Sequence, residues 1–531
     1  MGKLTPKQLA EKPGKLKGLR GTWETHWRSI AVYFLPLRRE INEEPAKGNK
    51  RNLQLLDNTG IQALELLSAG LQSMLTNPNL MWFDLTTGDE KLDDQDGIRQ
   101  WLQAETLNVH NVLNNSNFNT EVHQMYMDLG AFGTAAMLIE EDDESVIRFS
   151  TKHIKDIYIE ENNLGYIDRV YREFKWTAQN LVAEFGEEVM PRSVMECYKK
   201  NDTKEFYVVH GVYPKDSNDG PADELLPFVS QYVLKEEKVV LREGGFREFP
   251  YVIPRWTKAS NEVYGRSPAM NALPDMKTLN KMTETMMIAA QKVADPPLQV
   301  PDDGVVHPVI TRPGGLTHVR PGSEPIRPLF NQIPVDFGFQ AIEDRRQRVR
   351  QSFFVDQLQL QQGPQMTATE VLQRTEEKNR LLGPVLGRMQ SEFLRPLIDR
   401  VFSIMLKQGM ISDPPSELEG RDLDVKYSSM IARAQRISES QNILRTFEAA
   451  APFIQLDPNV RDMFNGDEIV RVLARSLNFP QRGLRNDEQI AEIREARAEA
   501  QQQMQQQEEA NQEADRISKV GPAVAAANQA G

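Results

Sequence analysis

The residue types that enzymes use for catalysis do not occur in this sequence at the spacings of known catalytic motifs. Lysine follows glycine only at Gly2-Lys3 and Gly14-Lys15, and neither pair has the earlier glycine of a P-loop, so nothing supports an ATPase motor. No G-x-S-x-G elbow of a serine hydrolase occurs. No two histidines stand four residues apart around a glutamate, as a zinc protease would require. The histidines are His26, His110, His123, His153, His210, His307 and His318.

Three runs of acidic residues are the remaining candidates for metal-dependent chemistry. They are Asp93-Asp94 with Asp96, the stretch from Glu140 to Glu144, and Asp302-Asp303. Carboxylates can hold the divalent cations of a nuclease. However, each run is contiguous and lies in a turn context, which is typical of solvated charge. We therefore predict that the protein is not an enzyme, has no catalytic residue and needs neither a cofactor nor a metal.

The composition indicates a large folded protein with an acidic surface. The chain has 531 residues, of which 40% are hydrophobic and 26% charged, enough for about three or four structural units. The net charge of −13 disfavours a protein that coats DNA, because neutralising phosphates needs a basic surface. The single cysteine, Cys197, excludes an internal disulfide. We expect no membrane span, because no run of about 18 apolar residues occurs.

The charge is unevenly distributed along the chain. Up to Asn52 there are 12 lysines and arginines against 5 acidic residues. One interpretation is a solvated face with a loose terminus. The other is contact with nucleic acid or with an acidic partner.

The first half of the chain has the pattern of an α+β unit. Apolar residues at helical spacing predict a helix near Asn58 to Thr76. Runs of β-branched and aromatic residues then predict strands between Ala135 and Leu241, with a hairpin-type turn at Asn162 to Gly165. Within this region, Thr177 is expected to cap a short helix that Gly186 closes.

Two helices then flank a proline-rich segment. The first begins at Ser267-Pro268, is expected to be reset by Pro274, and runs to Ala294. Nine of the 31 prolines lie between Asp295 and Asp336, which excludes a helix there. The second helix is expected from Asp336 to Phe354. It carries a basic cluster made of Arg345, Arg346, Arg348 and Arg350.

A polar loop follows, from Val355 to Met366. Thr367 and Glu370 have the spacing of a capping box, so a long helix is expected from Thr367 to about Lys407. Further helices are expected between Ile431 and Phe479, and the Gln-rich end has the composition of a disordered tail. The glutamines of the loop are Gln357, Gln359, Gln361, Gln362 and Gln365.

Five stretches, taken together, resemble the portal or head-to-tail connector proteins of short-tailed, T7-like bacteriophages. Singly they are weak apolar patterns, but their order and spacing are specific, and the resemblance extends from about Trp23 to Ala500. The stretches are Ala63 to Phe83, Phe132 to Leu138, Gly165 to Ala178, Phe249 to Asn280 and Met366 to Leu386.

The resemblance implies a mainly helical α+β subunit that assembles as a ring of about twelve copies. It implies a β-rich wing, two stem helices around a DNA channel, a Pro-rich clip and a helical crown. The expected divisions are an N-terminal basic segment (1–57), wing (58–267), stem helix (268–294), clip (295–335), stem helix (336–354), tunnel loop (355–366), long wing helix (367–408), crown (409–500) and polar tail (501–531).

The resemblance also implies the partners. The ring would sit at one capsid vertex of the virion, assembled in the host bacterial cytoplasm, and pass double-stranded DNA without sequence specificity. The large terminase subunit and tail adaptor proteins would dock on the clip, and capsid and scaffold proteins would surround the ring. The docking residues expected in the clip are Val305, Val306, His307 and Pro308, and the loop glutamines would face the DNA.

The alternative from another class is a capsid scaffold or internal structural protein without a channel. A scaffold would be almost wholly helical and would lack the β-rich wing. The arrangement of helix, Pro-rich segment and helix favours the portal interpretation. A channel must also let DNA slide, and a subunit of charge −13 with a Gln-rich loop suits weak contacts with phosphates.

Overall fold

The architecture is that of a computed structural model, which divides into two units. Unit 1 comprises Met1–Leu85, Ala104–Asp413 and Val425–Ser429, and unit 2 comprises Thr86–Gln103, Pro414–Asp424 and Met430–Gly531. The structure describes residues 3–41, 55–93, 95–215, 226–302, 308–329, 335–358, 381–418, 423–427, 443, 446, 449–450, 464–476, 485, 489–504 and 506.

A five-stranded antiparallel sheet forms one end of unit 1. Its strands follow one another in chain order, β4-β5-β6-β7-β8, so each pair is joined by a local connection. The predicted turn at Asn162 to Gly165 joins the first two strands, and Gly165 has a φ of 82° that suits glycine. The strands are β4 (Ile157–Glu161), β5 (Ile167–Thr177), β6 (Glu205–Pro214), β7 (Phe228–Leu234) and β8 (Val239–Phe246).

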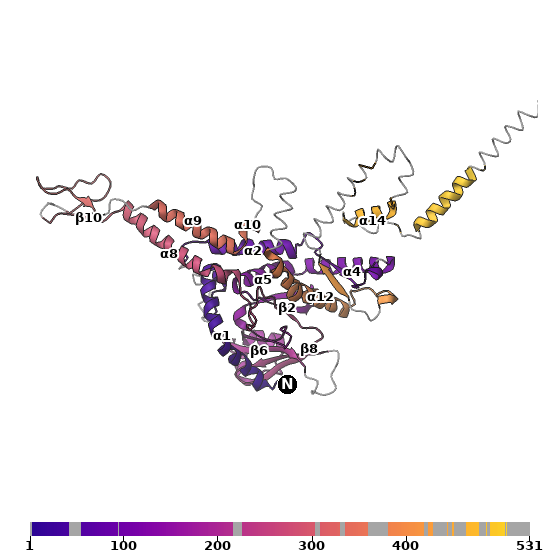
Figure 1. The fold of residues 1–531 in the computed structure, drawn as a ribbon. Helices are drawn as coiled ribbons and strands as arrows, with labels where there is room; N and C mark the ends of the chain where they lie inside the picture. Colours follow the sequence, from indigo (N-terminus) through magenta and orange to yellow (C-terminus); the bar gives the residue numbers. More distant parts are fainter. Residues whose placement is uncertain are drawn as a thin grey trace, which may run out of the picture. The chain divides into compact units, whose positions relative to one another are not determined.

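Helices cover both faces of this sheet. On one face lie α6 (Ala178–Phe185) and α7 (Arg192–Lys199), packed on a core that includes Phe174, Val208 and Leu234. The predicted caps of α6 are confirmed, since Thr177 accepts a hydrogen bond from the Asn180 amide and Gly186 has a φ of 85°. The other face is covered by α1 (Pro6–Phe34), whose position is visible in Figure 1.

The interpretation of the N-terminus as loose is wrong for the described part of the basic segment. A capping box between Thr5 and Gln8 starts α1 on the sheet, and Leu9 packs so closely on Gly211 that a Cβ there would lie 2.5 Å from it. Arg20 is buried, pairs with Glu24 at 2.8 Å and donates to three backbone carbonyls around the start of β4. The glycines and the proline of α1 lower its intrinsic helix propensity, and tertiary packing overrides that penalty.

A second group of elements connects the sheet to the rest of unit 1. The helices α2 (Thr59–Leu75) and α5 (Phe118–Phe132) pack on each other, and α5 ends at Gly133 with a φ of 76°. Strands β2 (Ala136–Asp142), β3 (Val146–Lys152) and β9 (Tyr251–Val252) form a three-stranded sheet in the order β3-β2-β9. The smaller elements here are η1 (Pro36–Arg38), β1 (Phe83–Thr86), η2 (Ile154–Asp156) and β12 (Asp424–Tyr427). The helix α4 (Asp96–Asn115) begins in unit 2 and continues into unit 1.

The long helix expected after Thr367 is described from residue 381 onward. It continues as α-helix to residue 389, passes through a π-helical turn at Gln390–Leu394 and ends with α12 (Arg395–Lys407). At the π turn, Glu392 accepts hydrogen bonds from the backbone amide, Nε and Nη2 of buried Arg255. The π turn thus carries the carboxylate that pairs with this buried arginine.

Unit 2 is described only in short pieces. Asp93, from α3 (Glu90–Asp93), accepts hydrogen bonds from the amide and hydroxyl of Thr87. The other elements are η4 (Ser416–Leu418), α14 (Gly466–Ser476) and the helical residues 489–504. Most of the residues expected to form the crown lie outside the described part of the chain.

Candidate functional site: the hairpin of α8 and α9

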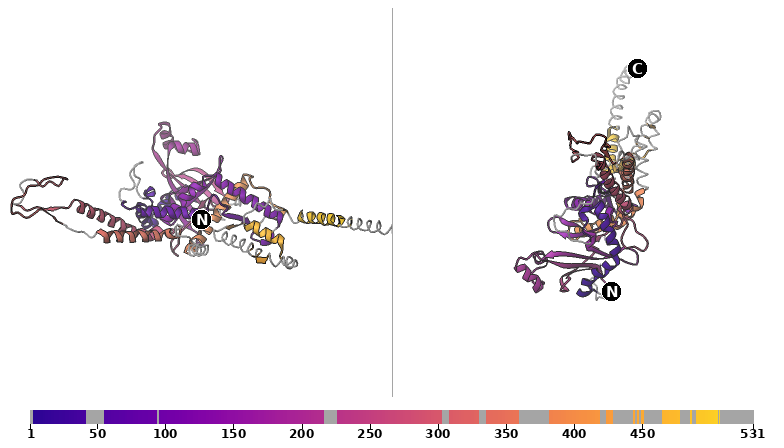
Figure 2. Two further views of the ribbon diagram at one scale, coloured as in Figure 1. Left: turned by 90° about the horizontal axis from the view of Figure 1, so that it is seen from above. Right: turned by 90° about the vertical axis from the view of Figure 1, so that its left-hand side faces the viewer.

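Two antiparallel helices form a hairpin that extends from unit 1. They are α8 (Pro268–Ala294) and α9 (Val335–Ser352), seen from two directions in Figures 1 and 2. Ser267 caps α8 by accepting from the Met270 amide at 3.1 Å, and its hydroxyl donates to the Ala131 carbonyl at 2.7 Å. The cap thus fixes the start of the hairpin to the end of α5.

The expectation that Pro274 resets α8 is wrong, because one helix runs through it. A proline inside a helix removes one backbone hydrogen bond and crowds the preceding turn. Here the neighbouring Leu273 and Met276 are buried against the body of unit 1. Gly60 of α2 lies so close that a Cβ on it would meet the Phe34 ring at 2.8 Å and the Met276 sulfur at 3.2 Å. This packing holds the helix together through the proline.

The predicted basic cluster is paired with carboxylates of the same chain. Arg345 binds Asp275 of α8 at 2.5 Å, and Arg346 binds the buried Asp57 at 2.9 Å. Arg348 pairs with Asp344 at 3.2 Å, and Arg350 lies 3.6 Å from Glu343. Two of the four arginines therefore hold the base of the hairpin together, and all four are at least partly neutralised.

The pKa of Asp57 shows that electrostatic attraction stabilises the base of the hairpin. Burial alone would raise the pKa of its carboxyl group, but hydrogen bonds from Thr59 and the charge of Arg346 outweigh burial and lower that pKa. Sequence reasoning missed both Asp57 and Asp275, because each is far from its arginine along the chain. The one local signal was the Asp57-Asn58-Thr59 run before α2, where Asp57 accepts from the Thr59 amide at 2.9 Å.

The outer half of the hairpin is exposed and partly apolar. In α8, the buried residues all lie between Pro268 and Leu279, and none of the described residues from 280 to 294 is buried. Met287 and Val293 are 52% and 53% exposed, and Phe339 of α9 is 58% exposed. The two helices touch closely where Gly338 faces Met286, since a Cβ on Gly338 would lie 2.3 Å from the methionine sulfur.

The two ends of the proline-rich segment pair with each other at the tip of the hairpin. Strand β10 (Leu298–Gln299) pairs with β11 (Arg327–Pro328), so the excursion begins and ends at one place. A tight turn at Gly315 is held by a hydrogen bond from its amide to the Arg312 carbonyl at 2.9 Å. Of the predicted docking residues, Pro308 is exposed, whereas Val305, Val306 and His307 lie outside the described residues.

The predicted loop from Val355 to Met366 begins with helix rather than loop. Val355–Leu358 forms the helical turn α10, which contains Gln357. Val355 is buried, and Leu358 packs on Gly70 of α2, where a Cβ would lie 2.8 Å from it. These apolar contacts order the turn. Gln359, Gln361, Gln362 and Gln365 lie outside the described residues.

The acidic runs do not converge in the part of the chain that the structure describes. Asp93 binds Thr87, Asp142 accepts from the Ser145 amide at 2.9 Å, and Asp302 is exposed. No group of three or more potential metal ligands is found among the described residues. In the same residues, no helix has the length and apolar character needed to cross a bilayer.

Comparison with known proteins identifies the family of the chain. The model of the family described as "Bacteriophage head to tail connecting protein" matches residues 6–484. The chain belongs to this family of phage portal proteins. The matched range includes the sheet with its covering helices, the α8–α9 hairpin and the segment at its tip.

Portal proteins of three phages are similar to the chain. A probable portal protein of Bordetella phage BPP-1 is 34% identical, covering 97% of this chain and 95% of the relative. The portal protein of Salmonella phage epsilon15 is 31% identical, with 94% and 93% covered. That of Enterobacteria phage T3 is 22% identical over 84% and 83%. The chain is a portal protein that functions where the capsid meets the tail.

Solved structures give a more distant likeness. A chain from the neck of an empty gene transfer agent particle is 11% identical, with 83% of this chain and 98% of that chain covered and a TM-score of 0.36. The scaffold alternative finds no support in these comparisons, because the family and the relatives over nearly the full length are connectors and portal proteins.

Proposed function

We propose that about twelve copies of this portal protein close into a ring whose central channel is lined by the α8–α9 hairpins. The observation that carries the proposal is the exposed apolar surface on the outer half of the hairpin, at Met287, Val293 and Phe339. Exposure of such residues to water does not stabilise a monomer, whereas contact with a neighbouring hairpin would bury them. A contact between two different surfaces closes into a ring or extends into a fibre, and a portal requires closure.

The remaining parts take the roles expected of the family. The elements between 58 and 267 form the wing, and the residues from 409 to 500 form a crown inside the capsid. The segment from 295 to 335 is a clip on which the large terminase subunit docks during packaging and tail adaptors bind later. The segment from 359 to 366, which follows α10, faces the DNA. Assembly takes place in the host bacterial cytoplasm, with capsid and scaffold proteins around the ring.

The pairing of the hairpin arginines supports a channel in which DNA slides. Each unpaired lysine or arginine facing a phosphate adds an attraction that depends on salt. Arg345, Arg346 and Arg348 already bind carboxylates of their own chain. They therefore stiffen the stem while adding little adhesion to double-stranded DNA of any sequence. We propose no chemical step for the protein, since its task is to hold and guide DNA that a motor moves.

The ring is tested by native mass measurement of the full-length protein. The wild type is expected to give one closed oligomer of about twelve subunits. A double variant, with Met287 and the neighbouring Ile288 (46% exposed) each replaced by glutamate, should shift the protein to monomers and small oligomers, because charges would be buried at the contact. Thr285→Glu, on the same exposed stretch of α8 but without loss of apolar surface, is the matched control. A wild type that stays monomeric at all concentrations would contradict the proposal.

A further inference from the structure

The segments that cover the two faces of the wing sheet differ in charge. Between Pro6 and Phe34, on one face, there are 6 basic and 2 acidic residues. The segment 178–204, on the other face, has 5 acidic and 4 basic residues, and two of the acidic ones, Glu187 and Glu188, are adjacent in the turn between α6 and α7. A subunit in a ring contacts its two neighbours through two different surfaces on opposite sides. A basic helix on one side and an exposed pair of carboxylates on the other are complementary charges for such a contact.

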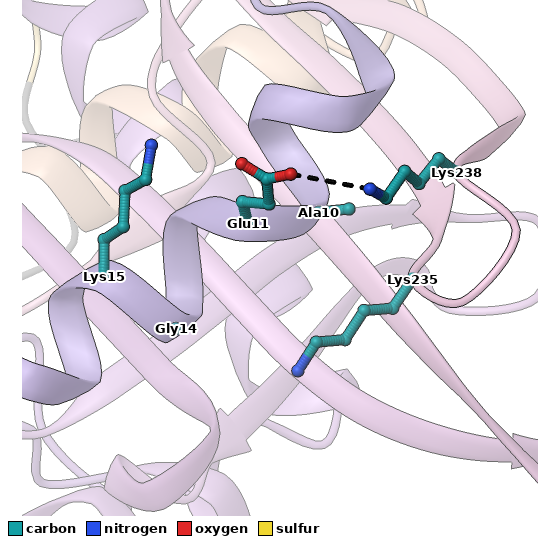
Figure 3. A pocket seen from close by; sticks show the side chains of 6 residues that line it. All are labelled: Ala10, Glu11, Gly14, Lys15, Lys235 and Lys238. Carbon is teal, nitrogen blue, oxygen red and sulfur yellow. Dashed lines mark hydrogen bonds and ion pairs between the residues drawn. The ribbon is translucent and has the colours of Figure 1, made fainter.

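An open hollow lies on the basic side, between α1 and the turn that joins β7 to β8. It has a volume of about 480 Å³ and is lined by Ala10, Glu11, Gly14, Lys15, Lys235 and Lys238 (Figure 3). Lys238 lies 3.5 Å from Glu11, and Lys235 binds Glu173 at 2.5 Å. No carboxylate partner of Lys15 is found in the described part of the chain. We call this hollow the α1 pocket; it has a small apolar floor and a cationic rim.

The helix surface beside the α1 pocket is open to close approach. Gly14, Gly18 and Gly21 lie inside α1, where glycine is among the least favourable residues. Among the described residues, a Cβ on any of the three would meet nothing within 4 Å, so packing within the subunit does not require them. Leu19 stands next to them and is 81% exposed. The pocket is thus bordered by bare backbone and by an apolar side chain that remains uncovered.

A complementary projection lies on the opposite side of the sheet. The turn between α6 and α7 presents Glu187 and Glu188, both exposed, and no ion pair is found for either within the described residues. Val189 follows them and is 38% exposed. Two carboxylates beside one apolar side chain match a pocket that combines a lysine rim with an apolar floor.

We propose that the α1 pocket of each copy receives the Glu187–Val189 turn of the neighbouring copy. The proposal rests on the ring put forward above, and it names the contact that joins adjacent wings. An acidic protein segment fits better than DNA, because other cations of α1 are already paired. Lys12 binds Glu160 at 2.9 Å and Arg20 binds Glu24 at 2.8 Å, so α1 offers no continuous row of free charges for phosphates.

The contact is tested by exchanging charges across it in the full-length protein. Lys15→Glu alone, and Glu187→Lys with Glu188→Lys, should each raise the subunit concentration needed for half-maximal ring formation by about tenfold or more, because like charges would meet. The triple variant, with both sides reversed, should return this concentration to within about threefold of the wild type. Lys7→Glu, on α1 but outside the pocket, is the matched control and should leave ring formation unchanged.

The outcomes distinguish a failure of this proposed contact from a failure of the proposed ring. Rings that form equally well in every variant would overturn the contact while leaving the proposed ring intact, and they would point to another acidic protein as the occupant of the pocket. A weakening by Lys15→Glu that the triple variant does not reverse would also overturn it. Failure of the wild type to form rings would instead contradict the proposed function.

Discussion

At the scale of single residues, burial rather than a catalytic role explains the shifted pKa values of two ionisable groups, Asp128 and His153. Asp128 of α5 is fully buried, and burial raises the pKa of its carboxyl group to about 6, although the nearby Arg38 opposes the rise. One of its oxygens lies 3.3 Å from Arg38 but lacks hydrogen-bond geometry. His153, stacked near Phe132, has its pKa lowered to about 3, chiefly by burial. Both groups lie in the packing between α5, η1 and β3.

The raised pKa of Asp128 predicts how the stability of the protein depends on pH. Its folded-state pKa is above its unfolded value, so its contribution to stability is complete below about pH 4 and is lost as the pH rises through about 6. Asp128→Asn should therefore be more stable than the wild type at pH 8, by up to about 3 kcal/mol, with the difference vanishing near pH 4. Denaturant unfolding at both pH values measures this. An equal difference at both would show that the carboxyl group does not titrate as described.

At the scale of elements, the origin of the hairpin depends on a close crossing of two backbone segments. The carbonyl of Gly133 accepts from the Trp256 amide at 2.9 Å, and the Gly265 amide donates to the Thr134 hydroxyl at 2.8 Å. A Cβ on Gly133 would lie 2.4 Å from the Gly265 carbonyl oxygen. Because α8 begins at Pro268, three residues after Gly265, its direction is set at this crossing.

Gly133→Ala should therefore be strongly destabilising. The substitution adds a clash with rigid backbone to the cost of a left-handed conformation. The matched control is Gly409→Ala, where φ is 71° and nothing lies within 4 Å among the described residues, so only the conformational cost of about 1–2 kcal/mol applies. We expect Gly133→Ala to cost at least about 1 kcal/mol more than the control in the free energy of unfolding. Equal costs would mean that the crossing is not tightly packed.

The elements also show what the sequence could and could not predict. The α6 helix was predictable because its signals, Thr177 and Gly186, lie next to it in the chain. The order and packing of α1 were not, because Leu9 and Trp27 are buried by residues far along the sequence. The same limit applies to the arginine cluster of α9. The residues were identified, but their partners, Asp57 and Asp275, are set by tertiary structure.

At the scale of the whole molecule, the proposal that residues 295 to 335 form the clip predicts different effects on ring formation and on DNA packaging. Prolines pre-set the backbone of the segment from 295 to 335, so it can present a fixed surface with little loss of entropy on binding. Replacing Val305 to Pro308 with a Gly-Ser linker should leave ring formation unchanged but abolish motor-driven DNA packaging. Packaging assays with purified rings measure both properties. Normal packaging by the altered rings would show that the motor docks elsewhere.

The central claim is that the α8–α9 hairpins line the channel of a closed ring. Electron cryomicroscopy of the purified full-length protein tests it most directly, without symmetry imposed at the first stage. We expect rings of about twelve subunits in which α8 and α9 surround the central opening and Met287, Val293 and Phe339 are covered by the adjacent hairpin. Open fibres, or rings in which the hairpins point outward with these side chains in solvent, would contradict the account.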